Sequence, residues 1–154
     1  MTLTLGGNDA ITSFSGTIRN SSGALSVRKI GLGIQTLTTG TPTYTGTTVA
    51  NAGTLTVNNT HNAQGGAYLA NGGNISVGAS GIVTNTSVTA TNGAVWVTGR
   101  LNGTTMPVTV QNLGTLGGTG VIIGTNEVQS GGLITGTLSV SNLVTVRAAA
   151  TPAS

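Results

Sequence analysis

The sequence predicts an all-β protein: a parallel β-solenoid (a right-handed β-helix) of about seven rungs with roughly 20 residues each. Three observations predict this fold. Short corner segments of the Asn-x-Gly type recur at a regular spacing. Aliphatic residues alternate with small polar residues around these corners, as in half-buried strands. Helical periodicity is almost absent, and charged residues are only 5% of the chain, against about 25% in an average soluble domain.

The repeat is clearest when the segments TTVANAGTLTV and AYLANGGNISV are aligned on one glycine. Glycine adopts positive φ without strain and asparagine tolerates it, so we expect these residues to turn the chain between two strands. Aligned in this way, the corner glycines are Gly23, Gly53, Gly73, Gly93, Gly114 and Gly132, and the corner asparagines are Asn51, Asn71 and Asn112.

Two strands are expected in each unit, one on either side of the corner. After the glycine, aliphatic residues at the second and fourth positions should face the core, as Leu55 and Val57 do in this pattern. Before it, the aliphatic position is four residues away, and Thr89 interrupts that series while Val88 stands one place out of register. A single unit has no partner for its apolar face, whereas stacked units bury it between them.

Residues 1–147 are expected to form one β-helix domain, with residues 148–154 as a C-terminal tail. The gap between Gly23 and Gly53 is longer than the other gaps and predicts an excursion near residues 30–46 that carries Tyr44. The alternative fold is an antiparallel β-sandwich, which would require tight hairpin turns and would leave the regular spacing as a coincidence.

The titratable residues do not indicate an enzyme. Asp9, Glu127 and His61 are the only carboxylates and the only histidine, and the two carboxylates lie near opposite ends of the sequence. General acid–base catalysis and metal binding need several such groups together. We therefore expect no catalytic residues, no metal site and no cofactor, and we place His61 in a solvated turn.

Nucleic-acid binding and membrane insertion are not indicated either. The net charge of +3 rests on five scattered cations, and aromatic residues, which would stack on bases, are 3% of the chain. No apolar run is long enough to span a bilayer. The cations are Arg19, Arg28, Lys29, Arg100 and Arg147.

Two aromatic residues are candidate contacts for a partner. Trp96 alternates with Val95 and Val97, so it should point outward if they face the core. An exposed tryptophan on a weakly charged surface favours contact with a neighbouring subunit or a glycan; the alternative is that it packs against a side loop. Tyr44 is the second candidate because of its place in the expected excursion.

Residues 2–57 resemble the passenger-associated autotransporter repeat of extracellular bacterial β-helix proteins. The resemblance is carried by the separated groups FSGTI at 14–18, Leu25 and Lys29, TYTG at 43–46 and AGTL at 52–55. The chain departs from that family's glycine-rich segment at GLGIQTL, residues 31–37. The resemblance implies a β-helix at the bacterial cell surface that serves as a stalk, adhesin or scaffold, and it implies no catalytic residues.

Three functions remain open at this stage. The first is an extracellular structural subunit that stacks head-to-tail on itself into a filament, sheath or surface layer. TLTL at 2–5 reads as an uncapped strand, and only Arg147 and Pro152 would protect the C-terminal segment, so open strand edges are expected at both ends. The second is an adhesin-type binding module for a glycan or host surface, and the third is a passive stalk segment of a larger protein.

Overall fold

The computed structural model describes residues 1–102 and 107–147 of the chain. Over these residues it contains 20 β-strands and no helix. The strands form three sheets, and every paired strand runs parallel to its neighbour. The predicted parallel β-solenoid is thereby confirmed, and the antiparallel sandwich is excluded. Successive rungs are about 20 residues apart, as in the pairing of Thr54 with Asn74.

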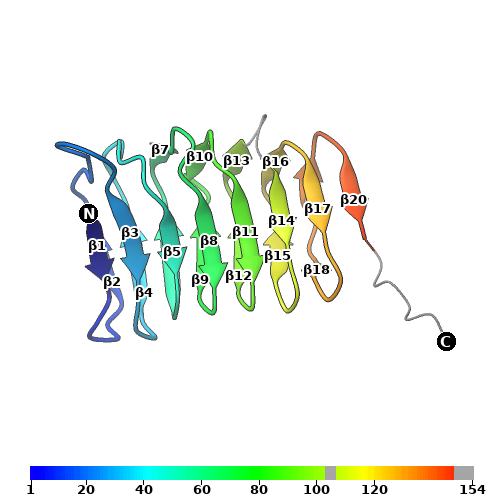
Figure 1. Cartoon of the computed structure of the whole chain (residues 1–154), viewed down its shortest axis with the longest axis horizontal. Helices are drawn as coiled ribbons and strands as arrows, with labels where there is room; N and C mark the ends of the chain where they lie inside the picture. The colour runs from blue at the N-terminus through cyan, green and yellow to red at the C-terminus, as the bar shows by residue number, and fades with distance from the viewer. Residues whose placement is uncertain (103–106, 148–154) are drawn as a thin grey trace.

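Sheet A has eight strands and runs the whole length of the coil (Figure 1). Its strands, in spatial order, are β1 (Thr2–Leu5), β3 (Ser26–Lys29), β5 (Thr48–Ala50), β8 (Tyr68–Asn71), β11 (Val88–Thr91), β14 (Val108–Val110), β17 (Asn126–Val128) and β20 (Val144–Val146).

Sheets B and C form the other two sides of the tube. Sheet B contains β2 (Thr12–Phe14), β4 (Ile34–Leu37), β6 (Thr54–Val57), β9 (Asn74–Val77), β12 (Ala94–Val97), β15 (Thr115–Gly118) and β18 (Leu133–Ile134). Sheet C starts only in the third rung and contains β7 (Thr60–Asn62), β10 (Ile82–Thr84), β13 (Arg100–Asn102), β16 (Val121–Ile123) and β19 (Ser139–Val140).

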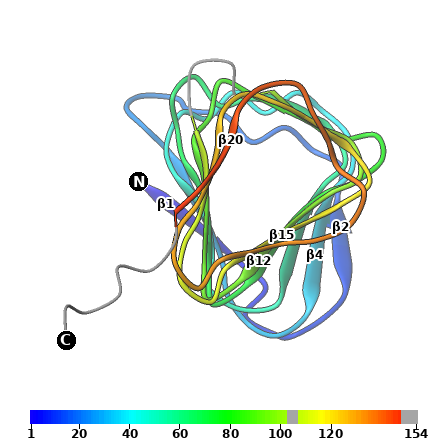
Figure 2. The ribbon, with the colours of Figure 1, turned by 90° about the vertical axis from the view of Figure 1, so that its right-hand side faces the viewer.

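The coil is right-handed, the usual hand for parallel connections. Sheet A lies on the near side of Figure 1, where its strands run downward while successive rungs advance to the right. Figure 2 looks along the tube from the C-terminal end and shows the rungs superimposed around one interior.

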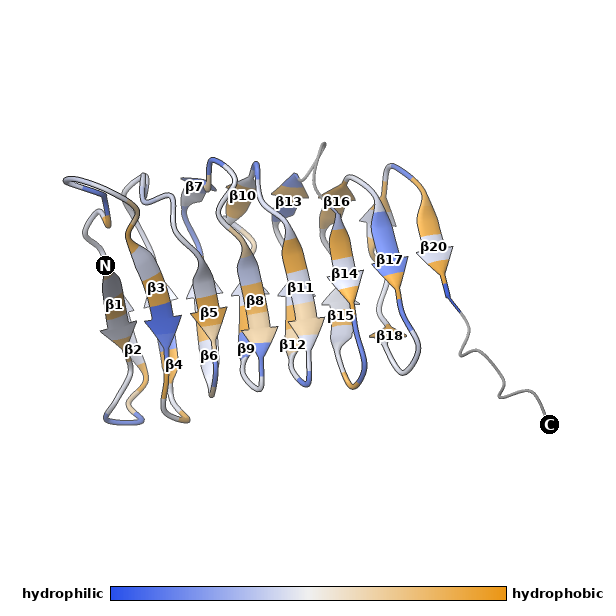
Figure 3. Ribbon diagram, viewed as in Figure 1, coloured by the Kyte–Doolittle hydropathy of each residue, from blue (hydrophilic) through white to orange (hydrophobic). Residues whose placement is uncertain are grey.

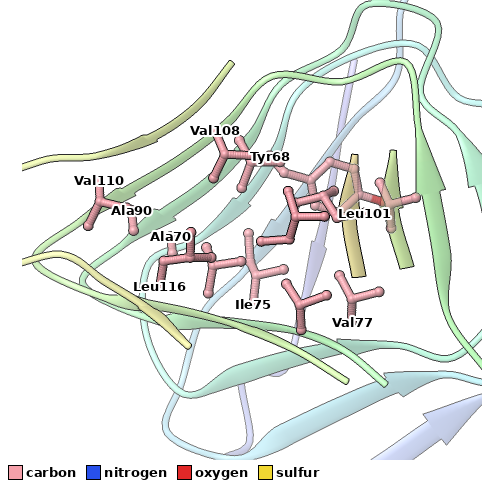
Figure 4. Close-up of a cluster of buried hydrophobic side chains, with 14 of the residues drawn as sticks. Tyr68, Ala70, Ile75, Val77, Ala90, Leu101, Val108, Val110 and Leu116 are labelled. Atoms are coloured by element: carbon pink, nitrogen blue, oxygen red, sulfur yellow. The ribbon is translucent and has the colours of Figure 1, made fainter. Parts of the chain in front are cut away.

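Side chains that point into the tube form continuous rows, because each one stacks on its counterpart in the previous rung. One row of sheet B runs from Leu55 through Ile75 and Val95 to Leu116, all of them buried. Figure 4 shows Ile75 and Leu116 pointing toward the same interior as Tyr68 and Leu101 from the other two sheets. Each fully buried aliphatic side chain contributes about 1.5–3 kcal/mol to folding, so the rows are the main source of stability.

In two strands of sheet A, the residues that point into the tube are not the ones expected from the sequence. Ala50 and Ala70 point into the tube, whereas Val49 and Leu69, the expected core residues, are half-buried on the outside. Val88, which is out of register in the sequence alignment, is a buried core residue. Counting back four residues from the glycine therefore gives the wrong face at Val49 and Leu69, whereas Val110 and Val128, found in the same way, are buried as expected.

The row of stacked corner glycines begins at Gly33, and the assignment of Gly23 to it was wrong. The amide of Thr54 donates to the carbonyl of Gly33, one rung below. Gly23 lies before β3, in the connection that enters sheet A, with open space around it. Its neighbour Val27 pairs with Thr48 of sheet A, and not with a residue of sheet B as the alignment required.

The expected excursion near residues 30–46 contains a regular strand in its first half. Within it, β4 pairs residue by residue with β6, from Ile34 with Thr54 to Leu37 with Val57. The second half of the expected excursion is irregular: residues 38–47, like residues 15–25 in the rung before, replace the sheet C strand in the first two rungs. The predicted tail, residues 148–154, lies outside the described residues.

Most of the corner glycines are required by close packing between rungs. Among those predicted, only Gly23 and Gly53 have positive φ, at 68° and 58°. Gly93 shows the other reason, since a Cβ there would collide with the carbonyl oxygen of Gly73 in the rung below. At the later corners the left-handed residue is the one before the predicted glycine: Gly72, Asn92, Leu113 and Gly131.

The three corner asparagines do lie at the turn from sheet A to sheet B. Asn71 ends β8, Asn51 follows β5, and Asn112 lies between β14 and β15. None of them has positive φ. The backbone amide of Asn51 donates to the carbonyl of Lys29 at 2.9 Å. Its side-chain oxygen, when turned toward Arg28, accepts a hydrogen bond from Nη2 of Arg28 at 2.8 Å.

We predict that Gly93→Ala destabilises the protein by about 1–3 kcal/mol, because the added methyl forces two rungs apart. Gly7→Ala is the matched control: its φ is not positive, and its nearest contact would be Ile30 Cδ1 at 3.9 Å. Urea denaturation measures both free energies of unfolding. Equal effects of the two substitutions would contradict the packing argument.

Candidate functional site

The charged and titratable groups do not converge on one site. Asp9 lies in the first corner and accepts a hydrogen bond from the amide of Leu32 at 2.6 Å. Glu127 is on the outside of β17, where it pairs with Arg147 at 2.6 Å, and such exposed pairs contribute about 0–1 kcal/mol. Within residues 1–102 and 107–147 there is no group of three or more His, Cys, Asp or Glu side chains that could hold a metal ion.

His61 was expected in a solvated turn, and this expectation was wrong. It lies on β7, points into the tube and is 1% exposed. Its Nε2 is 3.1 Å from the carbonyl oxygen of Tyr44 and its Nδ1 is 2.5 Å from the hydroxyl of Tyr68. A carbonyl only accepts, so Nε2 carries the hydrogen and Nδ1 accepts from Tyr68.

Tyr44 belongs to the same buried cluster and cannot be a surface contact, which corrects the second candidate. It is fully buried, and its hydroxyl lies 2.7 Å from the hydroxyl of Thr48 and 3.4 Å from that of Tyr68. The cluster fills the third and fourth rungs, at the position where sheet C begins. Its four members are Tyr44, Thr48, His61 and Tyr68, and each has a hydrogen-bond partner within the cluster.

Burial lowers the pKa of His61, and the hydrogen bond to the carbonyl of Tyr44, which favours the protonated ring, opposes this in part. Burial likewise raises the pKa of Tyr68. The folded state therefore holds a neutral imidazole between two neutral phenols. None of these three residues lines the N-terminal cavity described below.

Lys29 is a second polar residue inside the tube. It occupies the inner row between Leu5 and Ala50 and is fully buried. Its amine donates to the carbonyl oxygens of Ile30 at 2.5 Å and Gly31 at 2.7 Å. Burial lowers the pKa of Lys29, and the charge of Asp9 opposes this effect. The amine thus satisfies corner carbonyls that would otherwise lack partners.

Trp96 points outward, as the alternation predicted. It is 42% exposed on the outer face of sheet B, between Ser76 and Gly117 of the adjacent strands. Its indole leans over Gly117, where a Cβ would collide with the ring atom Cζ3. The ring therefore lies along a face made of small residues and keeps one side accessible.

The N-terminal end of the tube is hollow. A cavity of about 370 Å³ opens there, with apolar walls from β1, β2 and the first connection. Gln35, which is 8% exposed, takes a position held by leucine in the next rung; its Oε1 accepts from Thr12 at 2.7 Å, while its Nε2 has only two contacts, both of 3.5 Å. The cavity is lined by Leu3, Leu5, Thr12, Ser13, Phe14, Ile18 and Gln35.

The C-terminal end presents aliphatic side chains. Val144 and Val146 pair with the buried residues Asn126 and Val128, so both stand at inward positions of sheet A. They are nevertheless 40% and 72% exposed, because no described residue stacks beyond them. Figure 3 shows β20 as hydrophobic along most of its length, beside the hydrophilic β17.

Comparisons with family models, with curated proteins and with solved structures find no match for this chain. The resemblance of residues 2–57 to the autotransporter repeat therefore stays a prediction. In the described part of the chain, no helix is long and apolar enough to cross a membrane.

Sequence reasoning placed Trp96 on an outer face and expected open strand edges at both ends, but it did not recognise that inward aliphatic side chains are exposed there. The signal was present in TLTL and VTV, whose inward residues are all aliphatic. Lys29 and Gln35 were also missed as interior residues, because recognising them requires the register of each strand on the next. With that register, both are polar residues in rows that continue with alanine or leucine.

We predict that the protein loses stability as the pH falls below 6.5, the ordinary pKa of histidine. The unfolded chain binds a proton near that pH while the folded state resists it, so stability is complete above 6.5 and is lost as the pH falls toward the lowered pKa of folded His61. Urea midpoints between pH 7.5 and 5 measure the effect.

His61 is the only histidine of the chain, so His61→Gln is the natural control. This variant should show a nearly constant midpoint between pH 7 and 5. An equal pH dependence in the variant and in the original chain would exclude His61 as its source.

Proposed function

We propose that this protein is an extracellular structural subunit that stacks head-to-tail on copies of itself to form a filament, sheath or surface layer. The observation that carries this proposal is that, among the residues that the structure describes, sheet A ends at β1 on one side and at β20 on the other. A translation along the tube axis brings β20 of one copy beside β1 of the next in the same parallel sense as every existing pair. Contacts of this head-to-tail type build open fibres.

Backbone groups on the outer edge of β1 have no partner strand among the described residues. Met1 and Leu5 use their carbonyls for β3, accepting from the amides of Ser26 and Ile30, both at 2.9 Å. Residues alternate between the two edges of a strand, so the amide and carbonyl groups of Thr2 and Thr4 point away from β3. Exposed edges of this kind are templates for a further strand.

The apolar residues at both ends support the same proposal. Covering the cavity beside Leu3 and Leu5 and the exposed Val144 and Val146 would remove aliphatic surface from water at about 25 cal/mol per Å². A few surface charges would offer little electrostatic resistance to association. The extracellular location is supported by the low charge content and by the resemblance of residues 2–57, and it is a proposal on that basis.

Electron microscopy of the purified chain at several concentrations tests the proposal. We expect uniform filaments, and we expect Thr4→Pro to abolish them, because proline removes an edge-facing N–H and obstructs a new strand. Thr4→Val is the matched control, since it keeps the N–H and the strand preference and should still assemble. Circular dichroism should show the same thermal midpoint within about 4 °C for the two variants.

A monodisperse monomer at all concentrations would contradict the proposed assembly and would leave the passive stalk segment as the better explanation. Filaments that persist in Thr4→Pro would show that assembly does not use the β1 edge.

A second candidate function, an adhesin-type binding module, is favoured by Trp96. The indole offers a flat apolar face beside small polar residues, an arrangement that suits the apolar face of a sugar ring. Trp96 is the only tryptophan of the chain, so its fluorescence reports on this surface directly.

For this second candidate we predict a saturable fluorescence change with neutral cello- or chito-oligosaccharides. Calorimetry should show that Trp96→Ala weakens binding at least about tenfold, a loss of about 1.4 kcal/mol. Ser13→Ala, on the same outer row four rungs away, is the control and should bind like the original chain. No heat and no fluorescence change across the panel would remove this candidate.

A further inference from the structure

We infer that the joint between copies is a single parallel strand pair in a fixed register, with Leu3 of the next copy stacked on Val144 and Leu5 stacked on Val146. The inference rests on the proposed head-to-tail assembly and goes further by naming the two surfaces and their alignment. The partner is a second copy of this chain, and the joint adds β1 as a ninth strand to the eight of sheet A.

The alternation of backbone hydrogen-bonding groups along β20 fits this pairing. The carbonyl of Leu143 accepts from Asn126 at 2.9 Å, and the amide of Arg147 donates to Val128 at 2.8 Å. The odd-numbered residues of this segment thus face β17, and by alternation the amides and carbonyls of Val144 and Val146 face the free edge. These are the groups that a further strand would pair with.

The backbone groups at the edges of β20 and β1 are complementary in their alternation. In a pair of parallel strands, a residue whose backbone N–H and C=O groups bond to the other strand lies opposite a residue whose N–H and C=O groups point away from it. Thr145 and Glu127 stand opposite each other in this way. The edge-facing groups of β1 belong to Thr2 and Thr4. Placing Thr4 opposite Thr145 therefore lets Thr4 bond to both Val144 and Val146, and the same alignment brings Leu3 over Val144.

Side-chain positions select the same register. Leu3 and Leu5 are inward on β1, where they pair with Val27 and the buried Lys29. Val144 and Val146 are inward on β20. A shift of one residue would turn one pair outward and break the hydrogen-bonding phase. A shift of two would keep the phase but leave either Val144 or Val146 without a leucine above it.

The register fixes the axial repeat of the assembly. Eight strands of sheet A separate equivalent positions of successive copies, and at about 4.8 Å for each strand the repeat is about 38 Å. Sheet B ends one strand earlier, at β18. The described residues therefore leave one sheet B position empty at the joint, and the N-terminal cavity opens toward it.

Cysteine cross-linking tests this register, since the chain contains no cysteine of its own. Thr4→Cys and Thr145→Cys are made as separate proteins, mixed under assembly conditions and oxidised. The predicted Cα separation of one strand spacing lies within the range that a disulfide accepts. The expected product is a covalent dimer that contains one chain of each kind.

The matched control replaces Thr145→Cys by Thr109→Cys. Thr109 stands in the same outward row of sheet A, two strands further from the joint. It should give no dimer with Thr4→Cys, because about three strand spacings would separate the two sulfurs. The expected yield ratio between the two mixtures exceeds about tenfold.

The outcomes separate the register from the assembly itself. Filaments with a repeat near 38 Å and the Thr4–Thr145 dimer support both. Filaments without this dimer, or with an equal yield from Thr109→Cys, overturn the register and leave the head-to-tail assembly standing. A dimer formed by Thr4→Cys alone would indicate head-to-head contact and overturn both, as would the absence of both filaments and dimers.

Discussion

Parallel pairing of each rung with the next is the interaction on which the rest of the structure depends. It places equivalent residues one strand spacing apart, so an inward side chain always meets the corresponding side chain of its neighbours. The corners must follow the same spacing as the strands. That requirement explains Gly93, whose backbone lies so close to Gly73 that a Cβ has no room. A rung that cannot approach closely at its corner cannot complete its hydrogen bonds in the sheets.

Most of the polar side chains described above lie near the N-terminal rungs, whereas Asn126 is a buried polar residue in the later part of sheet A. Sheet C has no strand in the first two rungs. Lys29 and Gln35 lie in this region, and the cluster around His61 lies next to it, where sheet C begins. Each of these groups donates to backbone carbonyls or to hydroxyls that a purely aliphatic interior would leave without partners. From the fourth rung onward the inner rows are mostly valine, leucine, isoleucine and alanine.

In a fold of this kind, the groups that are available to bind a partner lie on the outer faces and at the two ends of the tube. The carboxylates and the histidine are separated, and the described residues contain no cluster suited to a metal ion. The ends differ from the sides because they expose both backbone groups and core side chains. Every pair of sheet A is parallel, so the outer edge of β1 has the same kind of hydrogen-bonding pattern as the edges already paired inside the sheet. This likeness of the two sheet A edges is the basis of the proposed head-to-tail association.

The sequence by itself determined the repeat length, the alternation within each strand and the position of Trp96 on an outer face. These features follow from local rules, since neighbouring residues of a strand point to opposite sides. Only the tertiary structure decided that Gly33 begins the row of corner glycines, that Ala70 lies inside while Leu69 lies outside, and that Tyr44 and His61 are buried together. The physical reason is that alternation is lost at a corner. Which face of the next strand points inward then depends on how that strand stacks on the rung beneath it.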